Sequence, residues 1–378
     1  MKKRILILTD WFLPGYKAGG PIQSLANFTH SFSDNYEISI VTTNLDLNET
    51  SPYPNIPANQ WVNLYNSRVF YFSKDELSYH NLKKLLLAES YDYFYLNSMY
   101  SVFFTLFPLW ILYGKTQQGK IVLAPRGMLM QGAMKVAYTK KRSFLTLFRW
   151  LGIHKQIIWQ ATDEQEKKDI LFWFGEQVQI EQVQNLPKSV RKSLPTHHKQ
   201  AGTVHFIFAS RVSVKKQLHF FLERLKAIKG NVVLDVFGVV EDENYLAHCQ
   251  SFIEQLPPNM KVSFKGAVSQ AELGQAYDKY DFSILPTLGE NFGHAIFDGL
   301  AAGKPVLISD KTPWLQLAEK EIGWDISLEN APKWEQIIRN CVEMDNETYQ
   351  KWSKNAHQFA LNFAQQPSLM QKYRILFS

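Results

Sequence analysis

The segment that decides the fold is GENFGHAIFDGLAAGKPV, residues 289–306. It follows a mostly apolar run, 282–285, and leads into a second one, 306–308, and both have the length and composition of buried strands. Between them lie a loop bounded by glycines and an apolar pattern with helical spacing. The order strand, loop, helix, strand is the unit from which nucleotide-binding α/β domains are built. We therefore expect a ligand crevice at the carboxyl end of the first strand.

Two carboxylates in this segment, Glu290 and Asp298, stand eight residues apart. A helix is expected to begin near Asn291 or Phe292, with its first N–H groups facing the crevice and carrying about half a positive charge. Asp298 then lies two turns along the helix on roughly the face of Glu290, within reach of a sugar hydroxyl. An acidic helix start without a ligand gives the same spacing. A diphosphate is expected to bind at Asn291, Phe292, Gly293 and His294.

The segment resembles the Glu-x7-Glu signature of family four of the retaining glycosyltransferases, the glycosyl transferases group 1, which have the GT-B fold. The similarity continues through Gly303-Lys304-Pro305 and on to 312–314 and 323–325. The resemblance implies that Glu290 contacts the sugar of a nucleotide-diphosphate donor and that Asp298 holds the ribose hydroxyls. This chain departs from the family at Asp298, where the family has a glutamate, one methylene longer.

Apolar runs alternate with helical patterns through both halves of the chain, and 378 residues are enough for two domains. The expected fold class is therefore α/β with two parallel sheets. The resemblance implies the GT-B arrangement, in which two Rossmann-like domains face a central cleft. Strands are expected at 4–9, 37–43, 69–72, 93–96, 120–124, 204–209, 232–237, 262–264, 282–285 and 306–308.

Polar segments with prolines mark the expected domain boundaries. The expected parts are an N-terminal acceptor-binding domain, 1–187, a hinge linker, 188–203, a C-terminal nucleotide-sugar-binding domain, 204–345, and C-terminal helices, 346–378. The resemblance implies that the last helices cross back to the N-terminal domain. The pair His197-His198 has no ligand partners at metal spacing and is expected to be exposed linker.

Cations follow the first strand of the second half, at Arg211 and Lys216. The resemblance implies that they hold the donor diphosphate, because a fixed cation stabilises the negative charge that grows as the diphosphate departs. Gln217 stands where the family has glycine, so Lys215 remains an alternative to Lys216.

Two sites in the first half are also expected on the donor side. The pair Gly19-Gly20 directly precedes a helical pattern, and the resemblance implies that this turn approaches the donor phosphate, although a plain loop gives the same pattern. Arg126, in the run APRGM at 124–128, ends a strand at a position where many relatives have histidine. With its Pro-Arg-Gly, this chain resembles a capsule and exopolysaccharide subgroup instead. Arg126 is expected to contact a phosphate or an acidic sugar, or else to cap strand-end carbonyls.

The net charge of +6 is unevenly spread, with no acidic residue between Asp92 and Asp163. Within this block, 138–151 mixes cations with apolar residues, so that one helical face can be basic and the other apolar. Such a surface suits an anionic inner-leaflet membrane and a lipid-linked oligosaccharide acceptor. A solvated basic face over a core helix is the alternative, and no nucleic-acid-binding pattern is present. The residues expected at this surface are Lys140, Lys141, Arg142 and Arg149.

Several patterns are missing from the sequence. It contains no Asp-x-Asp, no GxGxxG and no P-loop, so no metal or other cofactor is expected. The resemblance implies a nucleotide-diphosphate sugar as co-substrate, and a UDP-sugar is expected. Cys249 and Cys341 form no CxxC, which fits a reducing compartment. The longest apolar stretch, 102–113, is shorter than the roughly 20 residues of a membrane span and is expected to be a buried helix. A cytoplasmic location, peripheral to the inner face of the plasma membrane, is expected.

The expected function is a retaining, metal-independent glycosyltransferase that extends a lipid-linked glycan in cell-surface polysaccharide synthesis. A nucleotide-sugar epimerase of the same fold is one alternative. A catalytically silent glycan-binding partner of a polysaccharide assembly complex is another.

Overall fold

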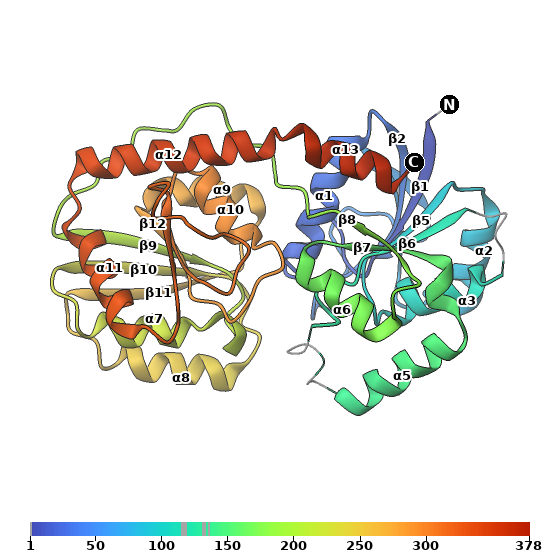
Figure 1. The fold of residues 1–378 in the computed structure, drawn as a ribbon, viewed down its shortest axis with the longest axis horizontal. Coiled ribbons are helices and arrows are strands. Elements are labelled where there is room, and N and C mark those ends of the chain that lie inside the picture. Colours follow the sequence, from blue (N-terminus) through green and yellow to red (C-terminus); the bar gives the residue numbers. More distant parts are fainter. Residues whose placement is uncertain (1, 115–118, 131–133, 135–136) are drawn as a thin grey trace. The chain divides into compact units, whose positions relative to one another are not determined.

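The computed structural model describes residues 2–114, 119–130, 134 and 137–378. The chain forms two compact units, one made of 1–186 and 367–378 and the other of 187–366 (Figure 1). Each unit has a largely parallel sheet with helices on its faces, so the expected α/β class with two Rossmann-like parallel-sheet domains is confirmed. None of the helices in the described part of the chain is long and apolar enough to cross a membrane.

The first unit is built on an eight-stranded sheet in the order β3-β4-β2-β1-β5-β6-β7-β8. All neighbours are parallel except β3, which pairs antiparallel with β4. The strands are β1 (Lys3–Leu8), β2 (Tyr36–Thr43), β3 (Trp61–Leu64), β4 (Ser67–Phe72), β5 (Tyr93–Leu96), β6 (Lys120–Leu123), β7 (Ile157–Ala161) and β8 (Gln179–Gln182). The helices are α1 (Gly20–Phe32), α2 (Tyr79–Ala88), α3 (Phe107–Leu112), α5 (Tyr138–Trp150), α6 (Glu164–Phe174) and α13 (Pro367–Leu376).

Both faces of this sheet are buried. Along β1, Ile5 and Ile7 join one hydrophobic cluster and Leu6 and Leu8 join another, as the alternation of side chains along a strand requires. The first cluster is completed by apolar residues of α1 and α13, which is why the last helix of the chain belongs to the first unit.

The stretch 102–113 is helical, as expected, but it is buried on one side only. It forms a π-helical turn, Val102–Leu106, followed by α3. Leu109 and Ile111 are buried, whereas Trp110 is 60% exposed, because a single helix can turn only one side toward the sheet.

The second unit has a six-stranded, fully parallel sheet in the order β11-β10-β9-β12-β13-β14. Its strands are β9 (Thr203–Ala209), β10 (Asn231–Phe237), β11 (Met260–Gly266), β12 (Phe282–Leu285), β13 (Val306–Ser309) and β14 (Gly323–Ile326). Its helices are α7 (Leu218–Leu225), α8 (Glu243–Ile253), α9 (Gln270–Ala276), α10 (His294–Ala301), α11 (Ala331–Glu343) and α12 (Asn346–Ala364).

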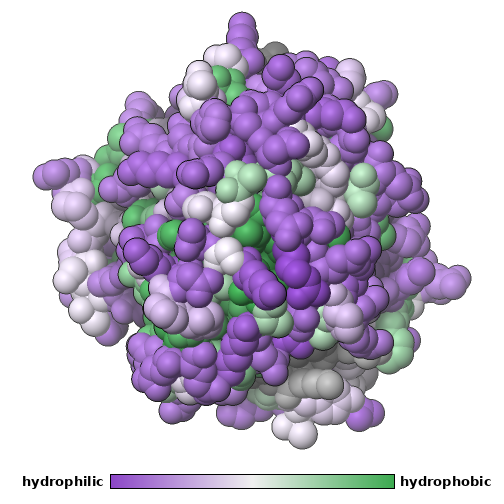
Figure 2. All heavy atoms as spheres, turned by 90° about the vertical axis from the view of Figure 1, so that its left-hand side faces the viewer, coloured by the Kyte–Doolittle hydropathy of each residue, from purple (hydrophilic) through white to green (hydrophobic). Residues whose placement is uncertain are grey.

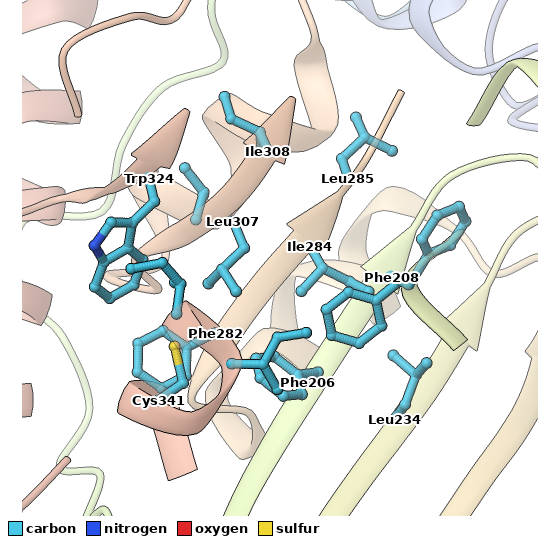
Figure 3. Close-up of a cluster of buried hydrophobic side chains, with 14 of the residues drawn as sticks. Phe206, Phe208, Leu234, Phe282, Ile284, Leu285, Leu307, Ile308, Trp324 and Cys341 are labelled. Carbon is cyan, nitrogen blue, oxygen red and sulfur yellow. The ribbon is translucent and has the colours of Figure 1, made fainter. Parts of the chain in front are cut away.

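Aromatic and aliphatic side chains from neighbouring strands fill the core of this unit (Figure 3). Phe206 of β9 lies 5.9 Å, centroid to centroid, from Phe282 of β12, and Cys341 of α11 is fully buried in the same cluster. Burial raises the pKa of the Cys341 thiol well above its ordinary value, so the thiol behaves as a small apolar group. Outside the core, hydrophilic residues cover most of the face of the unit that carries α11 (Figure 2).

Residues 188–203, predicted as a hinge, lie within the second unit. The expectation that the histidine pair is exposed linker was wrong for His197, whose Nε2 atom lies 2.7 Å from Oδ1 of Asp281. The ring of His197 also packs 5.5 Å from that of Tyr349. The predicted C-terminal segment, 346–378, divides between the units, with α12 in the second and α13 in the first.

The strand order of the second sheet has a reversal point. From β9 the chain builds outward through β10 and β11, and it then returns to place β12 on the other side of β9. In open parallel sheets, ligands bind outside the carboxyl ends of the strands at such a point. The loops that follow β9 and β12 are therefore expected to border a ligand site.

Candidate functional site

Three loops at the carboxyl edge of the second sheet are joined by hydrogen bonds. Thr287, which follows β12, is fully buried, and its hydroxyl donates to the carbonyl of Lys215 in the loop after β9 (3.3 Å). The hydroxyl of Ser309, at the end of β13, donates to the carbonyl of Thr287. The backbone N–H of Glu290 donates to the carbonyl of Lys311 after β13 (3.2 Å). The loop that carries Glu290 is thus held from both sides.

Lys216 and Glu290 meet at the reversal point. The Nζ atom of Lys216 lies 2.5 Å from Oε1 of Glu290, and the two side chains are only 11% and 12% exposed. The sequence left Lys215 as an alternative, but Lys215 is exposed, and Lys216 is the lysine that contacts Glu290. The structure therefore joins two of the predicted catalytic residues, from separate strand ends, into one nearly buried ion pair.

Gln217 stands where the resembled family has glycine, and its backbone conformation is one that favours glycine. Its φ of 56° lies in the left-handed region, which glycine adopts without strain. The turn Val214–Lys216 ends at this residue, and α7 begins directly after it. The glutamine thus adopts the backbone conformation for which a glycine is suited.

Arg211, the other predicted cation, does not contact Glu290. Its Nη1 atom lies 2.8 Å from Oε1 of Glu241, with the two side chains 38% and 47% exposed. Exposed ion pairs of this kind contribute roughly 0–1 kcal/mol to stability, so an anionic ligand could replace Glu241 at little cost.

The helix α10 begins at His294, later than the expected start near Asn291 or Phe292. The reason is Phe292, which is 4% exposed and packs its ring 5.4 Å from that of Trp314. The carbonyl of Phe292 accepts a hydrogen bond from Nε1 of Trp314, and Gly293 then reverses the chain with a φ of 78°. Phe292 is thus a core residue, and only its backbone can serve a ligand.

The start of α10 remains suited to an anion. Asn291 and His294 are half-buried beside it, and its N-cap residue, Gly293, has no side chain that could cap it. The first N–H groups of a helix require partners from outside the helix, and a phosphate can supply them.

Asp298, the predicted ribose ligand, is 3% exposed and lies on the buried side of α10. Its Oδ1 atom is 2.9 Å from Nζ of Lys188, whose side chain is 32% exposed. Burial and the nearby charge of Asp298 raise the pKa of Tyr277 well above its ordinary value. While the pair with Lys188 is closed, the carboxylate offers almost no surface to a ribose hydroxyl.

In the first unit, Gly19 and Gly20 begin α1. Gly19 has a φ of 69° and is the N-cap, Gly20 is the first helical residue, and Pro21 lies in the first turn. No atom lies within 4 Å of where a Cβ of Gly19 would be, so its glycine serves the backbone conformation and not close packing.

Arg126 follows β6 with a φ of 56° and donates hydrogen bonds to three side chains. Its acceptors are Oδ1 of Asn97 (2.6 Å), the hydroxyl of Tyr95 (2.8 Å) and Oδ1 of Asn185. Within the part of the chain that the structure describes, these acceptors are side-chain atoms and not strand-end carbonyls. It is a half-buried cation whose hydrogen-bond partners are uncharged.

The cations predicted to form a membrane surface all lie on α5 but do not share one face. Lys140, Arg142 and Arg149 are exposed, whereas Lys141 is half-buried with Nζ 5.1 Å from the ring centroid of Tyr100. Helical geometry explains the difference, because adjacent residues point about 100° apart around a helix of 3.6 residues per turn.

Sequence reasoning missed Lys188, Glu241 and Thr287. Each acts through a partner far away in the chain, so no local spacing could have revealed it. Within the described ranges, no group of three or more His, Cys, Asp or Glu side chains could hold a metal ion.

Comparisons with known proteins agree with this architecture. Residues 191–359, in the second unit, match the family of glycosyl transferases group 1. This match supports the resemblance drawn from the Glu-x7-Glu segment.

Solved structures of similar fold cover the whole chain. One is Anabaena Alr3699/HepE in complex with UDP and glucose, with a TM-score of 0.69 and 14% identity over 99% of both chains. Another is the sucrose-phosphate synthase of Thermosynechococcus elongatus, with a TM-score of 0.69 and 15% identity over 100% of this chain and 99% of that one. The fold is that of the GT-B glycosyltransferases.

A curated relative matches over a shorter stretch. It is the uncharacterised glycosyltransferase MJ1607 of Methanocaldococcus jannaschii, 25% identical over 118 residues. The match spans 31% of this chain and 30% of the relative.

Proposed function

We propose that this protein transfers a sugar from a UDP-sugar to a glycan acceptor and retains the anomeric configuration of the donor. The observation that carries the proposal is the nearly buried pair of Lys216 and Glu290 at the reversal point of the second sheet. The match of this region to glycosyl transferases group 1 supports it. A UDP donor is supported by the similarly folded Alr3699/HepE, which binds UDP and glucose.

The two charges have complementary roles in the proposed reaction. Lys216 exchanges Glu290 for the donor diphosphate and neutralises the negative charge that grows as the diphosphate leaves. Glu290, released from Lys216, then accepts hydrogen bonds from hydroxyls of the donor sugar. Arg211 adds a second cation by exchanging Glu241 for the diphosphate.

Retention without an enzyme nucleophile requires the acceptor to approach the face from which the diphosphate leaves. The bond from the anomeric carbon to the diphosphate oxygen breaks, and the acceptor oxygen forms the new bond to that carbon. The acceptor proton passes to the departing diphosphate oxygen, so no enzyme base is required. Since cations of the chain balance the diphosphate charge, the proposed reaction uses no metal and no other cofactor.

The proposed acceptor is a lipid-linked oligosaccharide of cell-surface polysaccharide synthesis. Its support is the run APRGM around Arg126, which resembles the capsule and exopolysaccharide subgroup. The half-buried guanidinium, with uncharged partners, can also pair with a phosphate or an acidic sugar. A lipid-linked acceptor places the enzyme in the cytoplasm, at the anionic inner leaflet of the membrane.

Assays of UDP release by the purified protein, with and without a lipid-diphosphate-linked acceptor, test the proposal. Release that depends on the acceptor is expected. Conversion of the donor to its epimer without UDP release would indicate the epimerase alternative, and neither reaction would indicate a silent glycan-binding protein. Activity should survive EDTA, and a loss of activity that manganese alone restores would refute the metal-independent reaction.

A further inference from the structure

The helices α3 and α5 of the first unit are neighbours (Figure 1). Both carry large apolar side chains that are exposed. Trp110 of α3 is 60% exposed, and Leu147 and Trp150 of α5 are 53% and 80% exposed. Trp110 and Leu147 line the same apolar groove, of about 180 Å³, between the two helices. Tyr113, 42% exposed, is tied to the end of α5 by a hydrogen bond from its hydroxyl to the carbonyl of Leu151 (2.9 Å). Trp110 and Leu147 thus share one groove, and Tyr113 and Trp150 lie next to Leu151, which also lines it.

The exposed side of α5 carries no charge along its centre. Thr139, Ser143, Thr146 and Trp150 follow one another at intervals of four, three and four residues, which places them on one line of the helix, with Leu147 beside it. All of them are exposed. We call this line, together with Leu147, the neutral stripe.

Cations flank the neutral stripe on both sides. Lys140 lies one heptad from Leu147 and therefore borders the stripe on that side, whereas Arg142 and Arg149, also one heptad apart, border it on the other. The opposite side of α5, with Leu145 and Phe148, is buried in the core and anchors the helix. The neutral stripe is thus not needed to hold α5 in place.

We propose that the neutral stripe of α5, together with Trp110 and Tyr113 beside it, docks on an anionic lipid bilayer. Trp150, Leu147 and Trp110 enter the region between head groups and acyl chains, where tryptophan is favoured because its ring is apolar and its N–H is polar. Lys140, Arg142 and Arg149 contact anionic head groups on either side. This inference rests on the proposed function, since it holds the enzyme where a lipid-linked acceptor is found.

Charge decides between a bilayer and a second copy of the chain. A symmetric dimer through this patch would set the flanking cations of one copy near those of the other, because a two-fold interface uses the same surface on both partners. The sequence between Asp92 and Asp163 supplies no carboxylate to balance them. Anionic lipid supplies that charge throughout the contact.

Sedimentation with vesicles tests the proposal without nucleotide sugar or acceptor. The protein should bind vesicles of phosphatidylcholine with about one third phosphatidylglycerol, and bind pure phosphatidylcholine at least about tenfold more weakly. Binding should weaken as salt shortens the screening length to about 8 Å at 0.15 M. Vesicle binding indifferent to lipid charge and salt would overturn the proposal.

Variants locate the surface. The double variant Leu147→Ser, Trp150→Ser should lower the partition coefficient about tenfold or more, and so should Lys140→Glu with Arg149→Glu. The matched control is Ile375→Ser on α13, because Ile375 is 51% exposed in the same unit and lies outside the patch, so its partition should not change. Thermal unfolding of each variant verifies that it is folded. Equal binding by the control and the stripe variants would overturn the proposal.

A conservative variant reports insertion directly. Trp150→Phe should bind nearly as well as the wild type but lose part of the fluorescence quenching caused by brominated acyl chains. Unchanged quenching would show that Trp150 stays out of the bilayer and would refute the insertion.

Light scattering in the absence of vesicles is expected to show a monomer. A dimer that Trp150→Ser dissociates would assign the patch to a second copy instead. If vesicle binding holds while UDP release fails, the proposed function fails and this inference stands.

Discussion

Lys216 and Glu290 are the residues on which the proposed chemistry depends most. Because their ion pair is nearly excluded from water, each charge acts strongly on any group that replaces its partner. Lys216→Ala and Arg211→Ala are each expected to slow transfer by about 10²-fold or more, as found when a donor to developing charge is removed. The measurement is kcat with saturating UDP-sugar.

The matched control for this series is Lys215→Ala, which removes the same charge from an exposed position next to the pair. Its effect is expected to be milder than that of Lys216→Ala. Equal small effects at all three positions would contradict the roles proposed for Arg211 and Lys216.

The two carboxylates should differ in the kinetic constant that they change. Glu290→Gln is expected to lower kcat strongly, whereas Asp298→Asn should mainly raise the KM for the donor, because ribose binding is common to ground and transition states. Asp298→Asn leaves Lys188, whose side chain is 32% exposed and can turn to water, so the variant should still fold. A collapse of kcat at Asp298 with Glu290 indifferent would reverse the two assignments, and NMR of the product showing inversion would refute retention.

In the candidate site, the sequence predicted which residues meet at the sheet edge but did not predict all of their ion-pair partners. Glu290 and Lys216 follow buried strands, so their meeting at one sheet edge follows from parallel topology. The ion pair of Asp298 with Lys188 depends on how a distant segment packs on α10, and no local pattern encodes it.

Helix α10 packs unusually close to the sheet at Gly299. A Cβ there would lie 2.8 Å from Cβ of Ser283 on β12, closer than side-chain carbons approach one another. Gly299→Ala is therefore expected to destabilise the protein by about 1–3 kcal/mol, the usual cost of overpacking. Urea unfolding followed by circular dichroism measures the change.

Gly274, inside α9, provides a matched control for the same substitution. No atom lies within 4 Å of its ideal Cβ position, so Gly274→Ala should stabilise the protein by about 0.4–1 kcal/mol through the reduced entropy of the unfolded chain. Changes of the same sign at both positions would refute the account of close packing at Gly299.

Among the elements, most buried strands were predicted, whereas the edge strands β3, β8 and β14 were missed and the edge strand β11 was predicted only at its centre, 262–264. β5 and β12, each buried along its whole length, have the predicted bounds. β3 and β8 are sheet edges with polar residues such as Asn63 and Gln179, and they lack the apolar pattern on which the prediction relied. β7 was missed although it is buried, since Gln160 interrupts its pattern and forms its hydrogen bonds with distant partners, Tyr95, Val183 and Tyr373.

For the whole molecule, composition and alternation were sufficient to predict two α/β units, because each half holds enough apolar strands for its own sheet. They could not predict that 188–203 packs within the second unit. That depends on buried polar contacts, such as the hydrogen bond from Nζ of Lys199 to the carbonyl of Val342 on α11 (3.3 Å), which have no signature in composition.

One of these polar contacts makes the stability of the fold depend on pH. Asp281, at the start of β12, accepts hydrogen bonds from the backbone N–H of His205 (2.7 Å) and from His197. Burial alone would raise the pKa of Asp281, but these hydrogen bonds outweigh burial and lower it from 3.8 to about 2. The imidazole of His205 also contacts Asp281, with Nδ1 3.4 Å from Oδ2, and this side-chain hydrogen bond raises the pKa of His205 above its ordinary value of 6.5.

The two shifts act in opposite pH ranges. A lowered carboxylate pKa stabilises the fold above the unfolded value of 3.8, and this contribution disappears as the pH falls toward about 2. A raised histidine pKa stabilises the fold fully below 6.5 and is lost as the pH rises through the folded value. The Asp281 cluster should therefore contribute most to the free energy of unfolding between about pH 4 and 6.5.

Urea unfolding of Asp281→Asn and of the wild type at pH 3, 5.5 and 8 tests this expectation. The loss of unfolding free energy should be largest at pH 5.5, where on the order of 2 kcal/mol comes from the carboxylate shift alone, and should shrink toward both extremes. The control Glu329→Gln removes an exposed carboxylate and should change stability by less than about 0.5 kcal/mol at every pH. A loss at Asp281 that stays constant from pH 3 to 8 would show that Asp281 stabilises the unit by hydrogen-bond geometry and not by its charge.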